Sequence, residues 1–239
     1  MDSTVPVPLH VGLIMDGDGR WAIQRGKPRL YGHRRGAENV RRIVVHAQSL
    51  GIRFLTLYAF SLENNRRPAV EVHGLLSLFE LYARRWLPQL LEQGIRIRLI
   101  GDVEALRPST AQALRKLEEN TRKGEKMTVI LAVNYGGRDE VLRAIRRLWN
   151  SGEKEGPTCW EDFEKFLDTA GIPDPDLILR SSGEMRLSHF LPLQSVYSEL
   201  YFPPVLWPDF SEKDLDEAVA VYRSRQRRFG RLEGQKRDA

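Results

Sequence analysis

The stretch that decides the fold is HVGLIMDGDGRWA, residues 10–22, in which an apolar run ends abruptly in two Asp-Gly pairs. The run His10–Met15 has the length and the β-branched content of a buried strand. It stops at Asp16-Gly17-Asp18-Gly19, a composition typical of a turn. In parallel sheets, ligands bind beyond the carboxyl ends of the strands, so this turn is the first place to look for chemistry.

The same alternation continues outward along the chain, where short apolar runs are separated by longer amphipathic stretches. Further strands are predicted at 54–60, 95–100, 127–133 and 177–179. Helices are predicted at 38–50, 70–93, 108–123, 139–150, 159–170 and about 212–227. No repeat or low-complexity linker interrupts this order. We therefore expect one α/β domain over residues 1–239, with a central, mostly parallel sheet flanked by helices and a basic, flexible tail at 228–239.

The composition excludes several classes of protein. With 41% hydrophobic and 29% charged residues, the chain is neither disordered nor collagen-like nor a coiled coil. No apolar run approaches the ~18–20 residues of a membrane span, and residues 1–4 lack the layout of a signal peptide, so a cytoplasmic location is expected. Cys159 is the only cysteine, which excludes an internal disulfide and a cysteine-rich zinc site.

The net charge of +5 invites a nucleic-acid interpretation, but its position argues against one. Residues 223–239 hold seven basic and two acidic side chains, so residues 1–222 balance to zero. A solvated tail explains this better than a nucleic-acid footprint, and no nucleic-acid partner is expected. Contact with an anionic membrane surface or with a substrate diphosphate remains as an alternative.

Four segments that follow predicted strands, or lie beside them, contain groups suited to binding anions or a metal ion. In the first, residues 15–21, glycines allow backbone N–H groups to approach an anion, Arg20 supplies a planar donor, and a carboxylate can hold Mg²⁺ against phosphate oxygens. It matches neither a Walker loop nor a dinucleotide fingerprint, and taken alone a plain Asp-Gly turn is the simpler interpretation.

The other three segments are rich in arginine. Residues 25–35 contain five basic side chains and His33, and a helix starting near Gly36 would direct its positive end toward the first turn. Residues 60–68 offer a hydroxyl, amides and two guanidiniums, and residues 180–188 could chelate a second polyanion. Two separable anion sites and long apolar helices favour a reaction between two diphosphates with apolar tails. A serine hydrolase is excluded because no G-x-S-x-G is present.

In these motifs the chain resembles the cis-prenyltransferases, and it resembles their undecaprenyl diphosphate synthase branch closely. The resemblance runs from His10 to Gly230 through HVGLIMDGDGRWA, YGHRRGAENV, LYAFSLENNRRP, IRLIGD, VNYGGRDE, DLILRSSGEMRLSHF, SELYF, LWPDF and RRFG. It implies a parallel sheet flanked by helices, a hydrophobic tunnel between sheet and helices, and a homodimer. Peripheral contact with a membrane during product release is also expected.

The resemblance further implies a Mg²⁺-assisted, head-to-tail condensation of an allylic prenyl diphosphate with isopentenyl diphosphate, giving a polyprenyl diphosphate. Asp16, Asn64 and Asp18 would be catalytic, with Asp16 and Glu199 as the metal-associated carboxylates. The expected allylic diphosphate site comprises Gly17, Asp18, Gly19, Arg20, Trp21, Arg29, His33, Ser61 and Arg67. The expected isopentenyl diphosphate site comprises Arg180, Arg186 and Ser188.

Three departures from the family pattern leave alternatives open. Asp18 stands where the family normally has asparagine, which adds a negative charge or a base near the metal-diphosphate site. Asn65 replaces the usual tryptophan, and Pro192-Leu193 replaces Leu-Trp, so aromatic wall is lost. One alternative is therefore a short-chain, head-to-middle or cyclised terpenoid product. Another, from a different class, is a non-catalytic subunit that supports a partner enzyme.

Overall fold

A computed structural model describes residues 7–152 and 155–225. Six parallel strands form one sheet in the order β3-β4-β2-β1-β5-β6. Their bounds are β1 His10–Ile14, β2 Phe54–Ser61, β3 Ile95–Ile100, β4 Met127–Tyr135, β5 Leu177–Arg180 and β6 Glu199–Tyr201. The central strands read as nearly continuous apolar runs because both of their faces are covered. The predicted parallel α/β architecture is confirmed.

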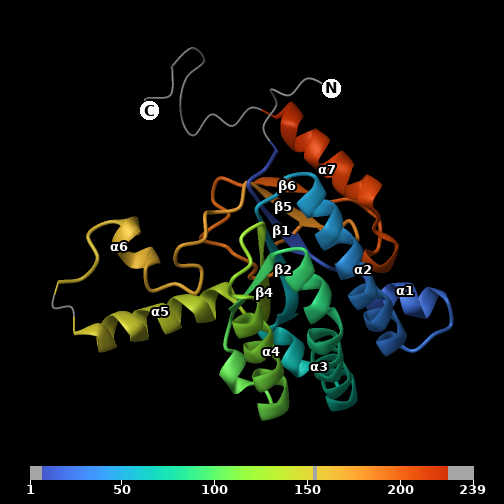
Figure 1. The fold of residues 1–239 in the computed structure, drawn as a ribbon, viewed down its shortest axis with the longest axis horizontal. Helices are drawn as coiled ribbons and strands as arrows, with labels where there is room; N and C mark the ends of the chain where they lie inside the picture. Colours follow the sequence, from blue (N-terminus) through green and yellow to red (C-terminus); the bar gives the residue numbers. More distant parts are fainter. Residues whose placement is uncertain (1–6, 153–154, 226–239) are drawn as a thin grey trace.

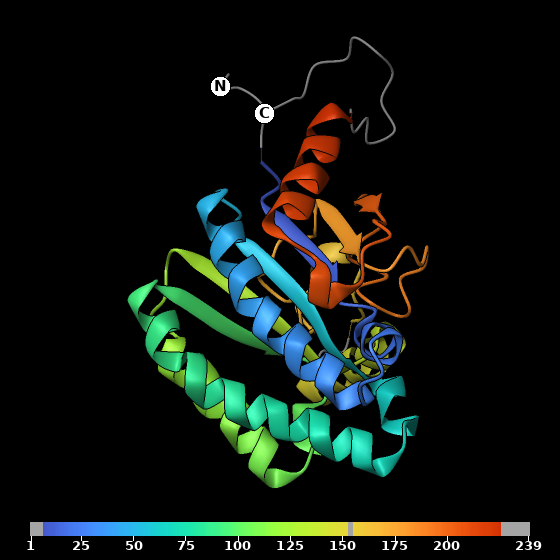
Figure 2. The same cartoon turned by 90° about the vertical axis from the view of Figure 1, so that its right-hand side faces the viewer.

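Helices cover one face of this sheet as a continuous layer (Figures 1 and 2). α2 (Arg29–Ser49) packs against α3 (Ala69–Glu92) and α7 (Glu212–Ser224), and α3 packs against α4 (Pro108–Thr121). α1 (Asp18–Gln24) lies against α2, while α5 (Gly137–Ser151) extends away from the body and leads toward the short α6 (Trp160–Glu164). Within the described residues, no helix combines the length and apolarity needed to cross a bilayer.

Alternating side chains along the strands divide the core in two. Leu13 and Leu57 belong to the large cluster under the α2–α3–α4 layer. Their neighbours Ile14 and Tyr58 point to the opposite face, where Phe190 joins them in a second cluster. This period of two is the ordinary geometry of a strand. As a result, the second face is sealed partly by a loop, residues 187–191, rather than by helices alone.

The helix expected to start near Gly36 in fact begins at Arg29, so that prediction was wrong. Gly32 and Gly36 do not end the helix. They lie on the side of α2 that faces α1, where a Cβ at Gly32 would collide with the backbone of Asp18 and a Cβ at Gly36 with its carboxylate. The two glycines therefore permit close packing of the first turn against α2.

Three other elements differ from the sequence-based expectation. The turn after β1 becomes helix α1 from Asp18 onward, with Gly17 in the left-handed region at its start. The helix predicted over 159–170 is helical only at Trp160–Glu164, because the chain then turns so that Asp168 accepts hydrogen bonds from Gly101 N and the Arg143 guanidinium. Strand β6 was not predicted. The predicted helix end at 227 and the tail at 228–239 lie outside the described residues.

Candidate active site

Asp16 lies two residues beyond β1 and meets Arg180, the last residue of the neighbouring β5. Arg180 Nη2 donates to Asp16 Oδ2 over 2.7 Å, and Arg20 Nη2 lies 3.3 Å from the other carboxylate oxygen. Partial burial opposes ionisation of Asp16, but the hydrogen bond and charge of Arg180 outweigh it and hold the pKa of this carboxyl below its usual range. Asp16 is thus a carboxylate at neutral pH, with its side chain 28% exposed.

Arg180 is buried and ties two segments together. While two of its nitrogens contact Asp16, Nη1 donates to the backbone oxygen of Arg186 over 2.6 Å and to Ser188 Oγ over 2.9 Å. The carboxylate of Glu184 adds a further link, because Arg20 Nη1 and Arg186 Nη1 donate to it over 3.0 and 2.5 Å. The segment after β1, which holds Asp16 and Arg20, therefore lies beside the segment 180–188, although the sequence predicted separate anion sites for them.

A second cluster centres on His33, whose ring lies between two carboxylates. His33 Nδ1 is 3.0 Å from Asp18 Oδ2, and Nε2 is 3.1 Å from Glu71 Oε1. Burial raises the pKa of Asp18 above its ordinary value, and the hydrogen bond with His33 offsets only part of that effect. The second oxygen of Asp18, Oδ1, is buried and has no partner among the described residues.

Glu71, at the start of α3, is the functional candidate that sequence reasoning missed. Its carboxylate accepts from Arg29 Nε over 3.0 Å and from Arg67 Nη1 over 3.2 Å, as well as contacting His33. Although burial opposes ionisation, the hydrogen bonds from Arg29 and His33 hold the pKa of Glu71 below its usual range. The only available signal was the i, i+4 spacing of Arg67 and Glu71.

Ser61 and Asn64 form a reciprocal cap at the start of the 3₁₀ turn Leu62–Arg66. The Ser61 hydroxyl accepts from the backbone of Asn64, and the Asn64 side chain accepts from Ser61 N over 3.2 Å. Next to them, Asn65 Nδ2 donates to Asn134 Oδ1 over 2.7 Å. The amide that stands in place of the expected tryptophan is thus used to fasten the turn to the end of β4.

The polar side chains enclose a basin that continues into an apolar tunnel. The basin measures about 730 Å³ including the part open to solvent, and is lined by residues 15–20 together with Arg29, His33, Arg67, Glu184 and Arg186. The tunnel measures about 970 Å³ on the same basis. Met15, Asp18, His33 and Arg67 line both. One molecule with a charged head and an apolar tail could therefore occupy them together.

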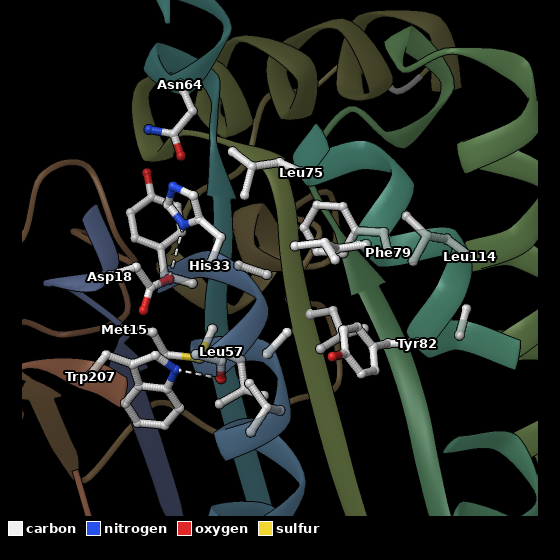
Figure 3. A pocket seen from close by; sticks show the side chains of 18 of the residues that line it. Met15, Asp18, His33, Leu57, Asn64, Leu75, Phe79, Tyr82, Leu114 and Trp207 are labelled. Carbon is white, nitrogen blue, oxygen red and sulfur yellow. Dashed lines mark hydrogen bonds and ion pairs between the residues drawn. The ribbon is translucent and has the colours of Figure 1, made fainter. Parts of the chain in front are cut away.

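The tunnel runs between the sheet and the helices α2 and α3. In Figure 3, Asp18, His33 and Asn64 lie on one side of the pocket and Leu75, Phe79, Leu114 and Tyr82 on the other. Its far end is lined by Tyr82 and Trp86, whose ring centroids are 4.8 Å apart. The hydrophobic tunnel expected from the family resemblance is therefore present between these elements.

Some of the expected site residues lie away from the basin: Ser61, Trp21 and Glu199 line neither the basin nor the tunnel. Trp21 is buried beneath the guanidinium of Arg25, 4.1 Å from its ring, and contributes only through the start of α1. Glu199 opens β6 beside Leu177, at the amino end of the ladder, whereas Arg180 ends β5. Its carboxylate accepts from Arg225 Nη1 over 2.8 Å. Within one chain, Glu199 does not join the cluster around Asp16.

The residues around Asp16 fit a metal ion that is held jointly with a substrate. Among the described residues, no group of three or more His, Cys, Asp or Glu side chains is placed to hold a metal. Mg²⁺, however, is commonly bound by one or two carboxylates together with substrate phosphates. Asp16 supplies an ionised carboxylate, and the guanidiniums of Arg20 and Arg29 line the same basin where phosphates would complete such a set.

Comparison with known proteins agrees with this geometry. Residues 14–230 match the family model for undecaprenyl diphosphate synthase. Isoprenyl transferases of Rhizobium meliloti and Thermotoga maritima are 49% and 45% identical, over 95% of this chain in each case and 93% and 98% of theirs. A crystal structure of lavandulyl diphosphate synthase from Lavandula x intermedia, in complex with dimethylallyl diphosphate, has a TM-score of 0.90 at 37% identity and covers 94% of this chain and 98% of that one.

The family match spans most of the chain, and the relatives exceed the identity at which a fold and a broad activity are shared. The resemblance seen in the sequence motifs is therefore confirmed, and so is the expectation of an enzyme. This chain belongs to the undecaprenyl diphosphate synthase family and is a prenyltransferase of the isoprenyl transferase type.

Proposed function

We propose that this protein condenses an allylic prenyl diphosphate with isopentenyl diphosphate, head to tail and with Mg²⁺, to give a polyprenyl diphosphate. The observation that carries the proposal is the continuity of the basin with the tunnel through Met15, Asp18, His33 and Arg67. A diphosphate requires guanidinium and backbone donors, and a prenyl tail requires an apolar cavity. This site offers both to a single ligand.

In the proposed reaction, the allylic diphosphate lies among Arg20, Arg29, His33 and Arg67 and the backbone of residues 17–20. Its C–O bond breaks, and the diphosphate leaves with the electron pair into a region of fixed positive charge, which stabilises it as it departs. Bound at Asp16, Mg²⁺ would add positive charge at the same phosphate oxygens. The tail extends between α2 and α3, away from water.

The second substrate lies on the other side of Asp16, at Arg186 and Ser188. Arg180 contributes charge from its buried position and holds both residues through the bonds described above. The π electrons of isopentenyl diphosphate form the new carbon–carbon bond, and loss of a proton restores a double bond. Asp18, which lines both the basin and the tunnel, is the carboxylate that would accept that proton. Asn64, whose amide is a poor base, orients the substrates.

Incubation of the purified protein with Mg²⁺, farnesyl diphosphate and isopentenyl diphosphate, followed by product mass analysis, tests the proposal. We expect products longer than farnesyl diphosphate by whole isoprene units. Recovery of unchanged farnesyl diphosphate, in the presence of Mg²⁺, would contradict catalysis and favour the non-catalytic subunit considered above.

A second candidate is an irregular condensation, in which the new bond forms at a different carbon. Two observations support it: the similarity to lavandulyl diphosphate synthase, and the replacement of the family's asparagine by a partly buried Asp18 beside His33. The same incubation with dimethylallyl diphosphate alone discriminates the two, because a head-to-tail enzyme requires isopentenyl diphosphate and gives no condensation without it.

We also propose that two copies of the chain assemble. Leu142, Ile145 and Trp149 are 55%, 47% and 86% exposed and form one stripe along α5, which extends from the body. Glu199 does not reach Asp16 within one chain, so any metal-associated role of this carboxylate needs a neighbouring copy. Peripheral membrane contact and a cytoplasmic location stay predictions from the sequence.

A further inference from the structure

The loop that carries Arg186 and Ser188 has an unusual backbone. Ser188, His189 and Leu191 have φ values of 49°, 65° and 46°, the left-handed region that residues with a Cβ rarely adopt. None of the three is glycine or asparagine, the residues that enter this region most readily. Such a conformation persists only where surrounding contacts over-determine it.

Tyr58, in the middle of β2, makes the contact directly beneath this loop. Its ring stacks on Phe190 with centroids 4.8 Å apart and an interplanar angle of 21°. Its hydroxyl oxygen lies 3.1 Å from the backbone oxygen of Ser188 and 3.1 Å from that of Tyr135. Because a hydroxyl has one hydrogen to donate, that hydrogen is shared between the loop and the end of β4.

Neighbouring residues also support the stacking of Tyr58 on Phe190 and the position of the loop. Gly12 on β1 leaves space for Ile178 and Phe190, since a Cβ there would lie 2.5 Å from Ile178 Cδ1 and 3.0 Å from the Phe190 ring. Gly137 N donates to His189 O over 2.8 Å on the other side of the loop. Burial raises the pKa of Tyr58 well above its ordinary value, so the hydroxyl keeps its proton.

We propose that Tyr58 is a positioning residue for the isopentenyl diphosphate side of the site: its hydroxyl and stacked ring hold Ser188, His189 and Leu191 in the left-handed conformation of the loop that carries Arg186 and Ser188. The consequence for catalysis rests on the function proposed above. The anchoring itself does not, because it concerns only the stability of the loop.

Different residues hold the isopentenyl diphosphate side and the allylic diphosphate side of the site. Arg180 fastens Arg186 and Ser188 from the Asp16 side, and Tyr58 fastens the following residues from the sheet side. By contrast, Arg29 and His33 belong to α2, Arg67 lies just before α3, and all three contact Glu71. Tyr58 also lines the tunnel but not the basin, so loss of its hydroxyl should disturb the isopentenyl diphosphate side more than the allylic diphosphate side.

Tyr58→Phe tests the proposal, and Tyr135→Phe is the matched control. Tyr135 belongs to the same cluster and loses the same atom, but its hydroxyl bonds to Glu140 over 2.6 Å and not to the loop. For Tyr58→Phe we expect a rise of about 5- to 10-fold in KM for isopentenyl diphosphate and a clearly smaller rise in KM for the allylic substrate, whose tunnel Tyr58 also lines. For Tyr135→Phe we expect both KM values to stay unchanged, whatever its loss in Tm.

Hydrogen exchange read by mass spectrometry adds a measurement that needs no activity. In Tyr58→Phe, peptides covering residues 186–191 should exchange faster than in the wild type, and in Tyr135→Phe they should not. Unchanged exchange in Tyr58→Phe, or an equal rise in KM for both substrates, would overturn the proposal. If the wild type itself shows no turnover, the proposed function fails and the exchange data alone decide whether Tyr58 anchors the loop.

Discussion

At the scale of single residues, Asp16 has a catalytic role and a structural role, and a mutation can separate them. Its charge would hold the metal and the departing diphosphate, while its oxygens also accept hydrogen bonds from the buried Arg180. Asp16→Asn keeps an acceptor for Arg180 but removes the charge. We expect kcat/KM to fall by about 10²- to 10³-fold with Tm nearly unchanged, because charge stabilisation in the transition state is lost.

Asp16→Ala should show the same kinetic loss plus a stability loss of about 1–3 kcal/mol, because a buried donor is left unpaired. Steady-state kinetics and thermal unfolding of both variants check this. The control is Asp209→Asn, which removes another carboxylate that pairs with an arginine, Arg25, outside the basin. Wild-type turnover in Asp16→Asn would exclude the metal role.

Asp18 makes stability depend on pH in a direction that can be worked out. Since burial raises its folded-state pKa, the folded protein binds more protons than the unfolded chain between the ordinary aspartate value and the raised one. Stability contributed by protonated Asp18 is complete below that window and is lost as pH rises through it. In Asp18→Asn the side chain cannot ionise, so this loss of folding stability with rising pH is absent.

We therefore expect the Tm of Asp18→Asn, relative to the wild type, to increase from about pH 4 to pH 7. Thermal unfolding across that range measures it. A Tm difference that is flat or falls with pH would show that Asp18 is ionised in the fold without penalty. Product analysis of the same variant tests whether the carboxylate also affects which proton is removed.

At the scale of elements, strands were easier to predict than helices. The strand at His10–Met15 and the strands at 54–60, 95–100 and 127–133 come within two residues of their structural bounds, since buried parallel strands are continuous apolar runs with glycine or aspartate at their ends. The start of α2 could not be predicted, because Gly32 and Gly36 resemble helix breakers until α1 is seen to pack on them. Their role is set by tertiary contact rather than by local preference.

The same limit explains β6 and the short α6. β6 spans only Glu199–Tyr201, and it becomes a strand because β5 offers it a free edge. The amphipathic pattern over 159–170 predicts one helix, but Asp168 has to reach Gly101, Arg143 and Arg147. That network involves segments far apart in the sequence, and no periodicity encodes it.

The helix α3 sets the depth of the tunnel. From Leu75 to Trp86 it rises about 16 Å, and the Tyr82–Trp86 pair lines the far end. A further apolar cavity of about 460 Å³ adjoins the tunnel, and Trp86 lines both. Trp86→Ala removes the side chain between the two cavities, and we expect the product distribution to shift to longer chains.

Mass analysis of products from the wild type, Trp86→Ala and Leu81→Ala checks this prediction. Leu81 is on the exposed face of α3, so its truncation changes the helix but not the tunnel and serves as the control. An unchanged distribution in Trp86→Ala would mean that a group other than this aromatic pair limits chain length.

At the scale of the whole molecule, much of the site could be predicted because the fold gathers strand ends at one edge. Asp16, Arg180 and the segment 60–68 are far apart in the sequence, yet each lies at the carboxyl end of a parallel strand, and Asp16 and Arg180 are in direct contact. Glu71 was missed because it lies inside a helix, where a carboxylate normally indicates an exposed face. Its role depends on how α2 and α3 pack, which the sequence pattern does not specify.

The α5 stripe gives a prediction about assembly. Trp149→Glu places a charge at the most exposed residue of the apolar stripe, and we expect it to convert a dimeric wild type to a monomer. Size-exclusion chromatography with light scattering measures the mass directly. Arg146→Glu, a charge change on the same helix outside the stripe, is the control. A monomeric wild type, or a Trp149→Glu protein that remains dimeric, would contradict the assignment.

The central claim is that one ligand places its charged head in the basin and its tail in the tunnel. A crystal structure with Mg²⁺ and an allylic prenyl diphosphate tests it most directly. We predict the diphosphate beside Asp16, Arg20 and Arg29, and the prenyl chain between α2 and α3, directed toward Tyr82 and Trp86. A diphosphate bound elsewhere, or a prenyl chain lying outside the tunnel, would contradict the account.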